Sequence, residues 1–298
     1  MNYFRNKFKT KNPEVKSKFE RIIVIGKNGF IGSSVINALN LKSIPTINIG
    51  RDEIDLTSKG AINYFSTKIL QSDIVVFAAG DVPVKTVEQF NANLTGLDNF
   101  IKGIDGKNLT QLIYVSSDAV YMDSNKPLTE DSFRGPANLH GLMHLTREII
   151  LQNSAHKNQL CIVRPTLIYG INDPHNGYGP CSFVRLAKYG KEIVLFGDGE
   201  EERDFIHITD VGEIISKVIL EQFIGDLNIA TGKVHSFFEI ASVISQVFGN
   251  KSKIVLTPRK GLMPHNGYRP FEINKLKTLF PTHSSKSLHE GINLMVDN

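Results

Sequence analysis

The stretch RIIVIGKNGFIGSS, residues 21–34, decides the fold class. Its first six residues form a short apolar, largely β-branched run typical of a buried strand. Gly26, Gly29 and Gly32 follow at three-residue spacing, and the amphipathic pattern over 30–39 predicts a helix. A glycine-rich turn between a strand and a helix lets backbone N–H groups approach a diphosphate closely. The stretch therefore predicts a dinucleotide-binding turn.

The same alternation of apolar strands and helices continues for about 150 residues. Further strands are expected over 44–49, 73–78, 111–115 and 160–163, and helices over 57–70, 87–103 and 139–154. Strands that are apolar throughout and alternate with helices indicate a parallel sheet covered on both faces. The expected fold is an α/β, Rossmann-type doubly wound parallel sheet.

The pattern changes after residue 170, where glycine and proline become more frequent and the expected strands and helices shorter. The expected elements here are strands over 193–196, 204–208 and 227–230, and helices over 209–222 and 236–249. A chain of 298 residues suffices for one large unit and a smaller lobe.

The expected domain organisation follows from these patterns. Residues 1–19 are expected to form a basic, flexible N-terminal extension, and 20–170 the dinucleotide-binding domain. Strand segments near 204–230 are expected to return to its sheet, whereas 171–203 and 231–298 are expected to form a discontinuous substrate-binding lobe.

Composition narrows the classes of partner. The net charge is +4, and no stretch of about 18 apolar residues could span a bilayer, so no membrane partner is expected. The basic segments carry few interleaved aromatic residues, which argues against nucleic-acid binding. The two cysteines, Cys161 and Cys181, form no C-x-x-C motif, and a reducing cytoplasm fits best.

The choice of dinucleotide depends on the residues that end the second strand. Arg51 comes first after Ile49-Gly50, and Lys27 adds a cation in the glycine turn, so together they would suit the 2′-phosphate of NADP. In the alternative, Asp52 holds the 2′-hydroxyl of NAD. We favour NADP over NAD.

Several motifs together resemble the extended short-chain dehydrogenase/reductase family, the NAD(P)-dependent nucleotide-sugar epimerases, dehydratases and reductases. They are GKNGFIGSS, DIVVFAAG, NANLTGLDNF, IYVSSDAVY, IVRPTLIYG and FGDGEEERDFIHITDV, and they run from about residue 20 towards the end of the chain. The resemblance implies a Rossmann domain with a small substrate lobe and a nucleotide-sugar substrate.

The resemblance also implies a cofactor site made by consecutive strand ends. Its expected members are Gly26, Lys27, Asn28, Gly29, Phe30, Ile31, Gly32, Arg51, Asp55, Ala78, Ala79, Gly80, Asn93, His140 and His144. Ser117 matches the family's catalytic serine or threonine, and Asp118 matches a position where the dehydratases carry an acid. The glutamate that follows in those dehydratases is Ala119 here, which counts against their standard mechanism.

The sequence departs from the family pattern Tyr-Gly-x-x-Lys-x-x-x-Glu. Gly141 and Glu148 keep the register, but His140 replaces the catalytic tyrosine and His144 the lysine. A histidine titrates near pH 6.5 and needs no neighbouring cation, so His140 can serve as general acid and base.

Two alternatives remain beside a histidine-based enzyme. The chain could bind the cofactor without redox catalysis, as a sensor or assembly partner. Histidines at i and i+4 could also share a metal ion, but no further ligand cluster accompanies them, and we expect no metal. The preferred interpretation is the enzyme.

The substrate contacts implied by the resemblance lie in the second half of the chain. Asn172 and Asn176 lie on a probable loop, and Arg203, Arg259 and Arg269 are expected to bind the substrate diphosphate. Family members often dimerise through the helices expected here over 87–103 and 139–154, so a homodimer is expected.

Overall fold

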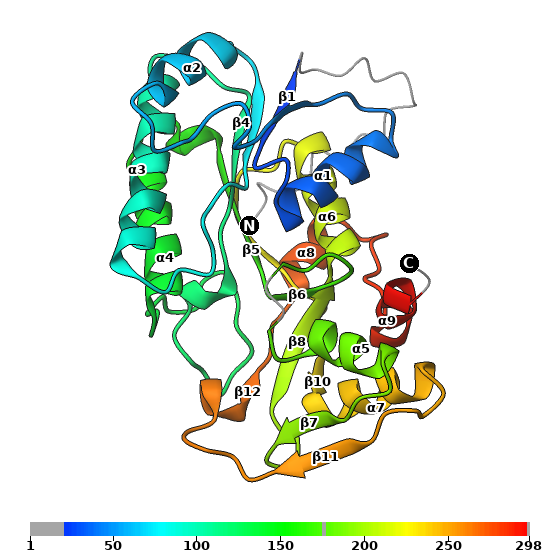
Figure 1. Cartoon of the computed structure of the whole chain (residues 1–298). Helices are drawn as coiled ribbons and strands as arrows, with labels where there is room; N and C mark the ends of the chain where they lie inside the picture. Colours follow the sequence, from blue (N-terminus) through cyan, green and yellow to red (C-terminus); the bar gives the residue numbers. More distant parts are fainter. Residues whose placement is uncertain (1–20, 175–176, 297–298) are drawn as a thin grey trace, which may run out of the picture.

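The computed structural model describes residues 21–174 and 177–296. The extension expected over 1–19 and the candidate Asn176 lie outside the described residues. The chain from Arg21 onwards forms a large sheet unit and a smaller lobe, one above the other in Figure 1.

A parallel sheet of six strands forms the larger unit. In spatial order its strands are β2 (Ile47–Ile49), β1 (Ile22–Ile25), β3 (Ile74–Phe77), β4 (Gln111–Val115), β5 (Leu160–Pro165) and β9 (Gly225–Ile229). The four strands β1, β3, β4 and β5 are buried at every position because helices cover both faces. This confirms the doubly wound fold that the alternation predicts.

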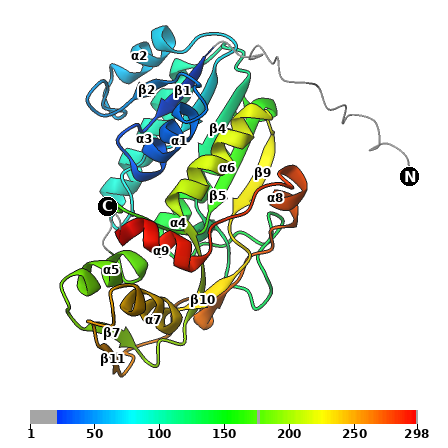
Figure 2. The ribbon, with the colours of Figure 1, turned by 90° about the vertical axis from the view of Figure 1, so that its right-hand side faces the viewer.

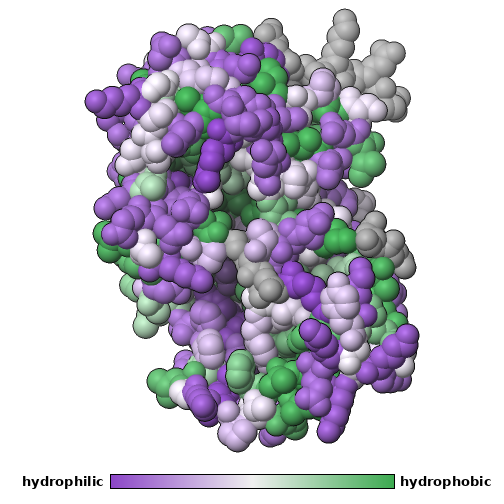
Figure 3. All heavy atoms as spheres, viewed as in Figure 1, coloured by the Kyte–Doolittle hydropathy of each residue, from purple (hydrophilic) through white to green (hydrophobic). Residues whose placement is uncertain are grey.

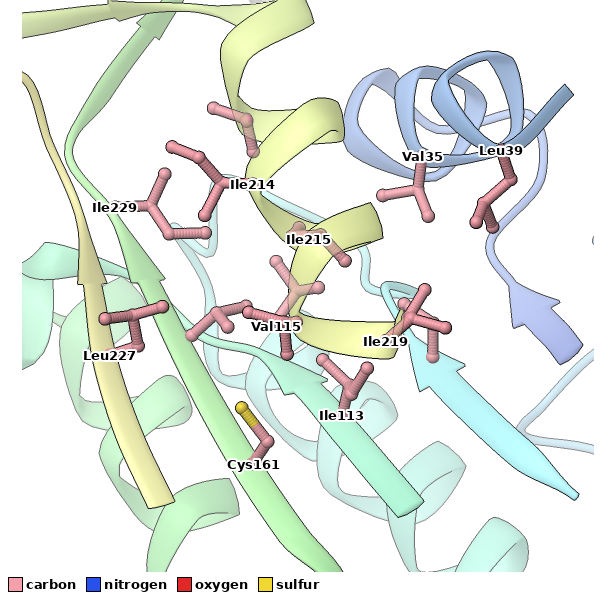
Figure 4. Packing of buried hydrophobic residues seen from close by; sticks show 14 of the residues in the cluster. Val35, Leu39, Ile113, Val115, Cys161, Ile214, Ile215, Ile219, Leu227 and Ile229 are labelled. Atoms are coloured by element: carbon pink, nitrogen blue, oxygen red, sulfur yellow. The ribbon is translucent and has the colours of Figure 1, made fainter. Parts of the chain in front are cut away.

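Two groups of helices cover the sheet. Helices α2 (Ala61–Lys68), α3 (Val87–Gly103) and α4 (Leu139–Gln152) lie on one face, and α1 (Phe30–Asn40) and α6 (Ile208–Leu220) on the other. Figure 4 shows side chains of α1 and α6 packed over β4, β5 and β9. Alternate residues of each strand enter the two apolar layers, which hold the carboxyl ends of the strands rigidly in place.

The smaller lobe has its own apolar core. Helices α5 (Pro180–Lys188), α7 (Phe237–Val247) and α9 (Leu288–Val296) pack there against the parallel strands β7 (Ile193–Phe196) and β11 (Ile254–Thr257). A second sheet connects the lobe to the large unit, and its four strands are labelled in Figure 1. Figure 2 shows the two units after a quarter turn, with α5, α7 and α9 together in the lobe. The second sheet consists of β10 (Val234–Ser236), β8 (Glu202–His207), β12 (Tyr268–Arg269) and β6 (Leu167–Tyr169).

The expected division of the chain needs two corrections. Strand β9 returns to the main sheet as predicted, but β8 does not, because it pairs with β6, β10 and β12 in the second sheet. Helix α8 (Asn274–Leu279), expected in the substrate lobe, instead inserts Leu276 into the core of the large unit. The surface is hollowed between the two units, where the parallel strands end (Figure 3). Among the described residues, no helix combines the length and apolar character needed to cross a membrane.

Candidate functional site

Two cavities meet at the carboxyl ends of the main strands. The first, of about 570 Å³, is lined by the glycine turn and by the segment after β2. The second, of about 900 Å³, extends from the same turn towards the small lobe. Five residues line both cavities: Gly29, Ala78, Ala79, Gly80 and Arg147. An elongated ligand can therefore occupy both cavities by passing over this junction.

The three glycines of the turn have different physical roles. Gly26 has φ +105°, and a Cβ there would lie 2.9 Å from the carbonyl of Ala78. A Cβ on Gly32 would lie 2.1 Å from the carbonyl oxygen of Gly26, so both glycines are required for packing. Gly29 has an ordinary extended conformation, with φ −77°, and faces the junction. It is the N-cap of α1 and provides no side-chain cap, which leaves the first-turn N–H groups for an anion.

The cations expected to choose the dinucleotide are separated by the structure. Arg51 is exposed and lines the first cavity together with Asn28. The Lys27 ammonium instead forms ion pairs with Asp52, at 2.6 Å, and with Glu53. Its hydrogen bond lowers the pKa of the Asp52 carboxyl. Neither Lys27 nor Asp52 lines the cavity. Of the three residues considered for choosing between NADP and NAD, only Arg51 therefore lies at the cavity.

Two further expected cofactor residues lie in this cavity wall. Asp55 accepts hydrogen bonds from the Thr57 backbone N–H at 2.9 Å and hydroxyl at 2.8 Å, which lower the pKa of its carboxyl. The Asn93 amide oxygen accepts a hydrogen bond from Asp81 N–H, and its NH₂ group donates to carbonyl oxygens of Asp81 and Gln89. The Asn93 side chain therefore shapes the wall.

The reaction side of the second cavity combines Ser117, His140 and His144 with Phe30 and Ile31 of the glycine turn. Ser117 begins a short 3₁₀ turn after β4, and its hydroxyl accepts the N–H of the residue two positions on. His140 and His144 lie on the first turns of α4, with ring centroids 4.8 Å apart and planes at 89°. The structure thus brings these three expected catalytic residues to one cavity, which the fourth, Asp118, also lines.

His144 is held by a residue that the sequence analysis does not single out. The Tyr114 hydroxyl lies 2.8 Å from the Nδ1 atom of His144. Burial lowers the pKa of His144 well below its usual value and raises that of Tyr114, so both stay neutral near pH 7. The Arg147 guanidinium also contacts this phenol, so Tyr114 links the two side chains of α4. His144 lines the second cavity.

Asp118 and Arg269 contact each other, although one is expected as an acid and the other as a substrate ligand. The Nε atom of Arg269 lies 3.0 Å from the Asp118 carboxylate, and Nη1 lies 2.9 Å from that of Asp123. Both residues line the second cavity. Arg269 donates to the carboxylate and to the carbonyl oxygen of Asp118, so Asp118 is placed to position Arg269.

The other two arginines meet through a shared carboxylate. Glu201 accepts a hydrogen bond from Arg203 at 2.5 Å and another from Arg259 at 3.3 Å. Arg203 and Glu201 line the second cavity, whereas Arg259 lies behind them. Asn172 adopts a left-handed conformation, with φ +67°, and lines neither cavity.

Arg147 is the second residue of the site that the sequence analysis does not single out. It lies seven positions after His140 and three after His144, so all three share one face of α4. Arg147 could have been identified from this spacing, because it places a charged residue on the same face of α4 as the two candidate histidines. Within the described part of the chain, no group of three or more His, Cys, Asp or Glu side chains is arranged to hold a metal ion.

Comparisons with known proteins agree with this geometry. A model of the NAD dependent epimerase/dehydratase family matches residues 22–230. The UDP-N-acetyl-alpha-D-glucosaminuronate decarboxylase of Bacillus cytotoxicus is 27% identical over 92% of this chain and 95% of its own length.

Solved structures of low identity share the fold. A UDP-glucose 4-epimerase from Thermotoga maritima, solved with UDP-glucose, has a TM-score of 0.80 at 21% identity, covering 93% of this chain and 98% of its own. A GDP-L-fucose synthetase from Naegleria fowleri bound to NADP has a TM-score of 0.79 at 16% identity, covering 94% and 93%.

Proposed function

Because the chain belongs to the NAD dependent epimerase/dehydratase family, we propose that it is an NADP-dependent enzyme acting on a nucleoside-diphosphate sugar, with His140 as its acid and base. One observation carries the proposal. The cavity that holds Ser117, His140 and His144 is continuous with the glycine turn at Gly29. A dinucleotide lying across the junction therefore reaches the side chains suited to proton transfer.

The residues present fit such a cofactor. The uncapped first turn of α1 supplies N–H donors for a diphosphate, and Gly29 leaves the space for it. When bound, the nicotinamide supplies hydride exchange with a sugar carbon. His144, which lines the same cavity, would form a hydrogen bond with a cofactor hydroxyl.

Proton transfer is the task of this chain's own side chains. The Ser117 hydroxyl holds the reacting sugar oxygen, and His140 takes up or returns the proton of that oxygen. Arg203 binds the substrate diphosphate, with Arg269 and Arg259 beside it. Ala119 provides no acid next to Asp118, so an epimerase or a ketoreductase fits better than a dehydratase.

The test combines a cofactor titration with a panel of substrates. Reduced cofactor is mixed with the protein, and nicotinamide fluorescence is followed on addition of UDP-, dTDP- and GDP-linked sugars and their keto forms. We expect cofactor binding and turnover of at least one nucleotide sugar. Binding without turnover of any of them would support a cofactor-binding protein that has lost redox catalysis.

Cofactor preference gives a second prediction. Arg51 lines the adenosine-side cavity and Asp52 does not, so NADP should bind about tenfold tighter than NAD, or about 1.4 kcal/mol. Replacing Arg51 with Gln should abolish the preference, whereas Lys85→Gln, on an exposed residue outside both cavities, should not. Isothermal titration calorimetry with both dinucleotides measures the effect. Equal affinities in the unmodified protein would assign the ribose to a carboxylate instead.

Association gives a third prediction. Helices α3 and α4 lie side by side on one face of the molecule (Figure 1) and expose Val87, Leu142 and Ile149. We propose that this face forms a homodimer interface, because burying it removes apolar surface from water. Sedimentation should show a dimer at micromolar concentration that Ile149→Glu dissociates. The control Leu41→Glu changes an exposed leucine at the end of α1 and should leave the dimer intact. A monomeric unmodified protein would refute this proposal.

A further inference from the structure

Arg147 is a charged side chain almost completely removed from water. Its exposed fraction is 2%, and burial lowers the pKa of its guanidinium. Its Nη1 donates to the Ala79 carbonyl at 2.9 Å, and Nε and Nη2 donate to the Asn93 carbonyl oxygen at 3.2 and 2.5 Å, with Nη2 also 3.0 Å from the Asn93 side-chain oxygen. The guanidinium also contacts the Tyr114 phenol and lies 5.5 Å from the centroid of the Phe77 ring. These partners are neutral.

The charge of Arg147 has no counterion within the described residues. The other three buried arginines of the described residues have carboxylate partners: Arg164 pairs with Glu148, Arg203 with Glu201 and Arg269 with Asp118. No carboxylate of residues 21–174 or 177–296 forms an ion pair with Arg147. A buried cation without a counterion is costly, because hydrogen bonds to carbonyl groups only partly replace its hydration.

The position of this charge indicates what compensates it. Arg147 is one of the five residues that line both cavities, and Gly29 is another. A ligand with its adenosine in the first cavity and its nicotinamide in the second has its diphosphate at this junction. Both Arg147 and the amino end of α1, which begins after Gly29, therefore border the region of that group.

We propose that Arg147 is an electrostatic partner of the dinucleotide diphosphate, acting from within the protein opposite the glycine turn. The inference rests on the proposed cofactor site and adds a binding residue to it. Attraction between charges is strong in a low-dielectric environment, and a buried charge is hardly screened by salt. The contribution of Arg147 should therefore persist at high ionic strength, whereas that of the exposed Arg51 should weaken.

The experiment compares ligands that differ in phosphate content. Adenosine, ADP and NADP are titrated by NMR and calorimetry into the unmodified protein and into Arg147→Gln. We expect the variant to bind ADP and NADP about tenfold to a hundredfold more weakly, at both about 0.05 M and about 0.5 M salt. The affinity for adenosine should not change. Arg51→Gln is the matched control, and its effect on NADP should shrink at the higher salt concentration.

The remaining outcomes separate the two proposals. An unmodified protein that binds neither ADP nor NADP refutes the cofactor site itself. If it binds both and Arg147→Gln retains their affinity, only the role of Arg147 is refuted. Equal losses for adenosine and ADP would show that Arg147 merely supports the wall at Ala79 and Asn93. If Arg147→Gln does not fold, Arg147→Lys is tested instead. We expect the Lys variant to keep the preference for ADP over adenosine. If a folded Lys variant loses this preference, the inference is refuted.

Discussion

Replacing His140 with Ala is expected to lower turnover by about 10²–10⁴-fold while dinucleotide binding persists. His140 lies on the first turn of α4 and lines the second cavity together with Ser117. Burial keeps the neighbouring His144 neutral, because its pKa is held well below the usual value. A pH dependence of turnover near neutrality that disappears with His140→Ala would therefore belong to His140.

Steady-state rates with a substrate identified in the nucleotide-sugar panel measure the effect, and cofactor fluorescence measures binding. His289→Ala on α9, where the ring is exposed and outside both cavities, is the matched control and should keep the parental rate. A parental rate for His140→Ala would remove the acid and base assignment and leave two packed histidines on an ordinary helix.

The single variant His140→Tyr should not support turnover at the parental rate. A phenol has a pKa of about 10 and requires a nearby cation to ionise near neutrality. His144 is neutral, and the Arg147 charge lies one turn further along α4, beside Tyr114. His140→Tyr combined with His144→Lys would supply an ammonium group, although it would lie near the uncompensated Arg147. Activity of the single variant equal to that of the parent would contradict the proposed role of the ring.

The main sheet was predictable because its signal is local. Strands β1, β3, β4 and β5 are apolar runs, and the helices between them repeat apolar residues at helical spacing. Strands β6, β10 and β12 have no such signal, because they have two or three residues each and form by pairing with β8. Helix α8 is also too short for a periodic signal, and its place in the main core depends on contacts with distant strands.

The candidate site was predictable as a set of residues, but less so as a set of contacts. The glycine turn, Ser117 and the two histidines come together because parallel strands end at one edge. The pairing of Asp118 with Arg269, 151 positions apart, changes the expected role of both and has no local signal. The sequence places Lys27 near Arg51 but does not show that Asp52 and Glu53 engage it first.

Arg147 shows most clearly where sequence reasoning ends. Its spacing from His140 is visible, but a charged residue on a helix is usually solvated. Its burial depends on carbonyl groups of Ala79 and Asn93, which the chain brings from β3 and α3. The proposed role of Arg147 therefore depends on tertiary contacts that the sequence alone does not reveal.

Replacing Gly29 with Val is expected to abolish dinucleotide binding, with a loss of at least roughly a hundredfold, or about 2.7 kcal/mol. The reason is its place at the junction of the cavities, where a branched side chain fills the space of the diphosphate and covers the amino end of α1. The backbone at Gly29 is allowed for any residue, and an added Cβ lies 3.2 Å from the Gly26 carbonyl oxygen, which a small shift relieves. The protein should therefore fold.

The three-glycine turn thus allows binding and folding to be tested separately. Gly32→Val should prevent folding, because its Cβ would lie 2.1 Å from the Gly26 carbonyl oxygen. Gly60→Val is the matched control, since Gly60 also precedes a helix in an ordinary conformation, φ −73°, but lies outside both cavities. Circular dichroism and thermal melts report folding, and calorimetry reports affinity. A folded Gly29→Val protein with the parental affinity for NADP would show that the diphosphate does not cross this turn, and the cofactor site would have to lie elsewhere.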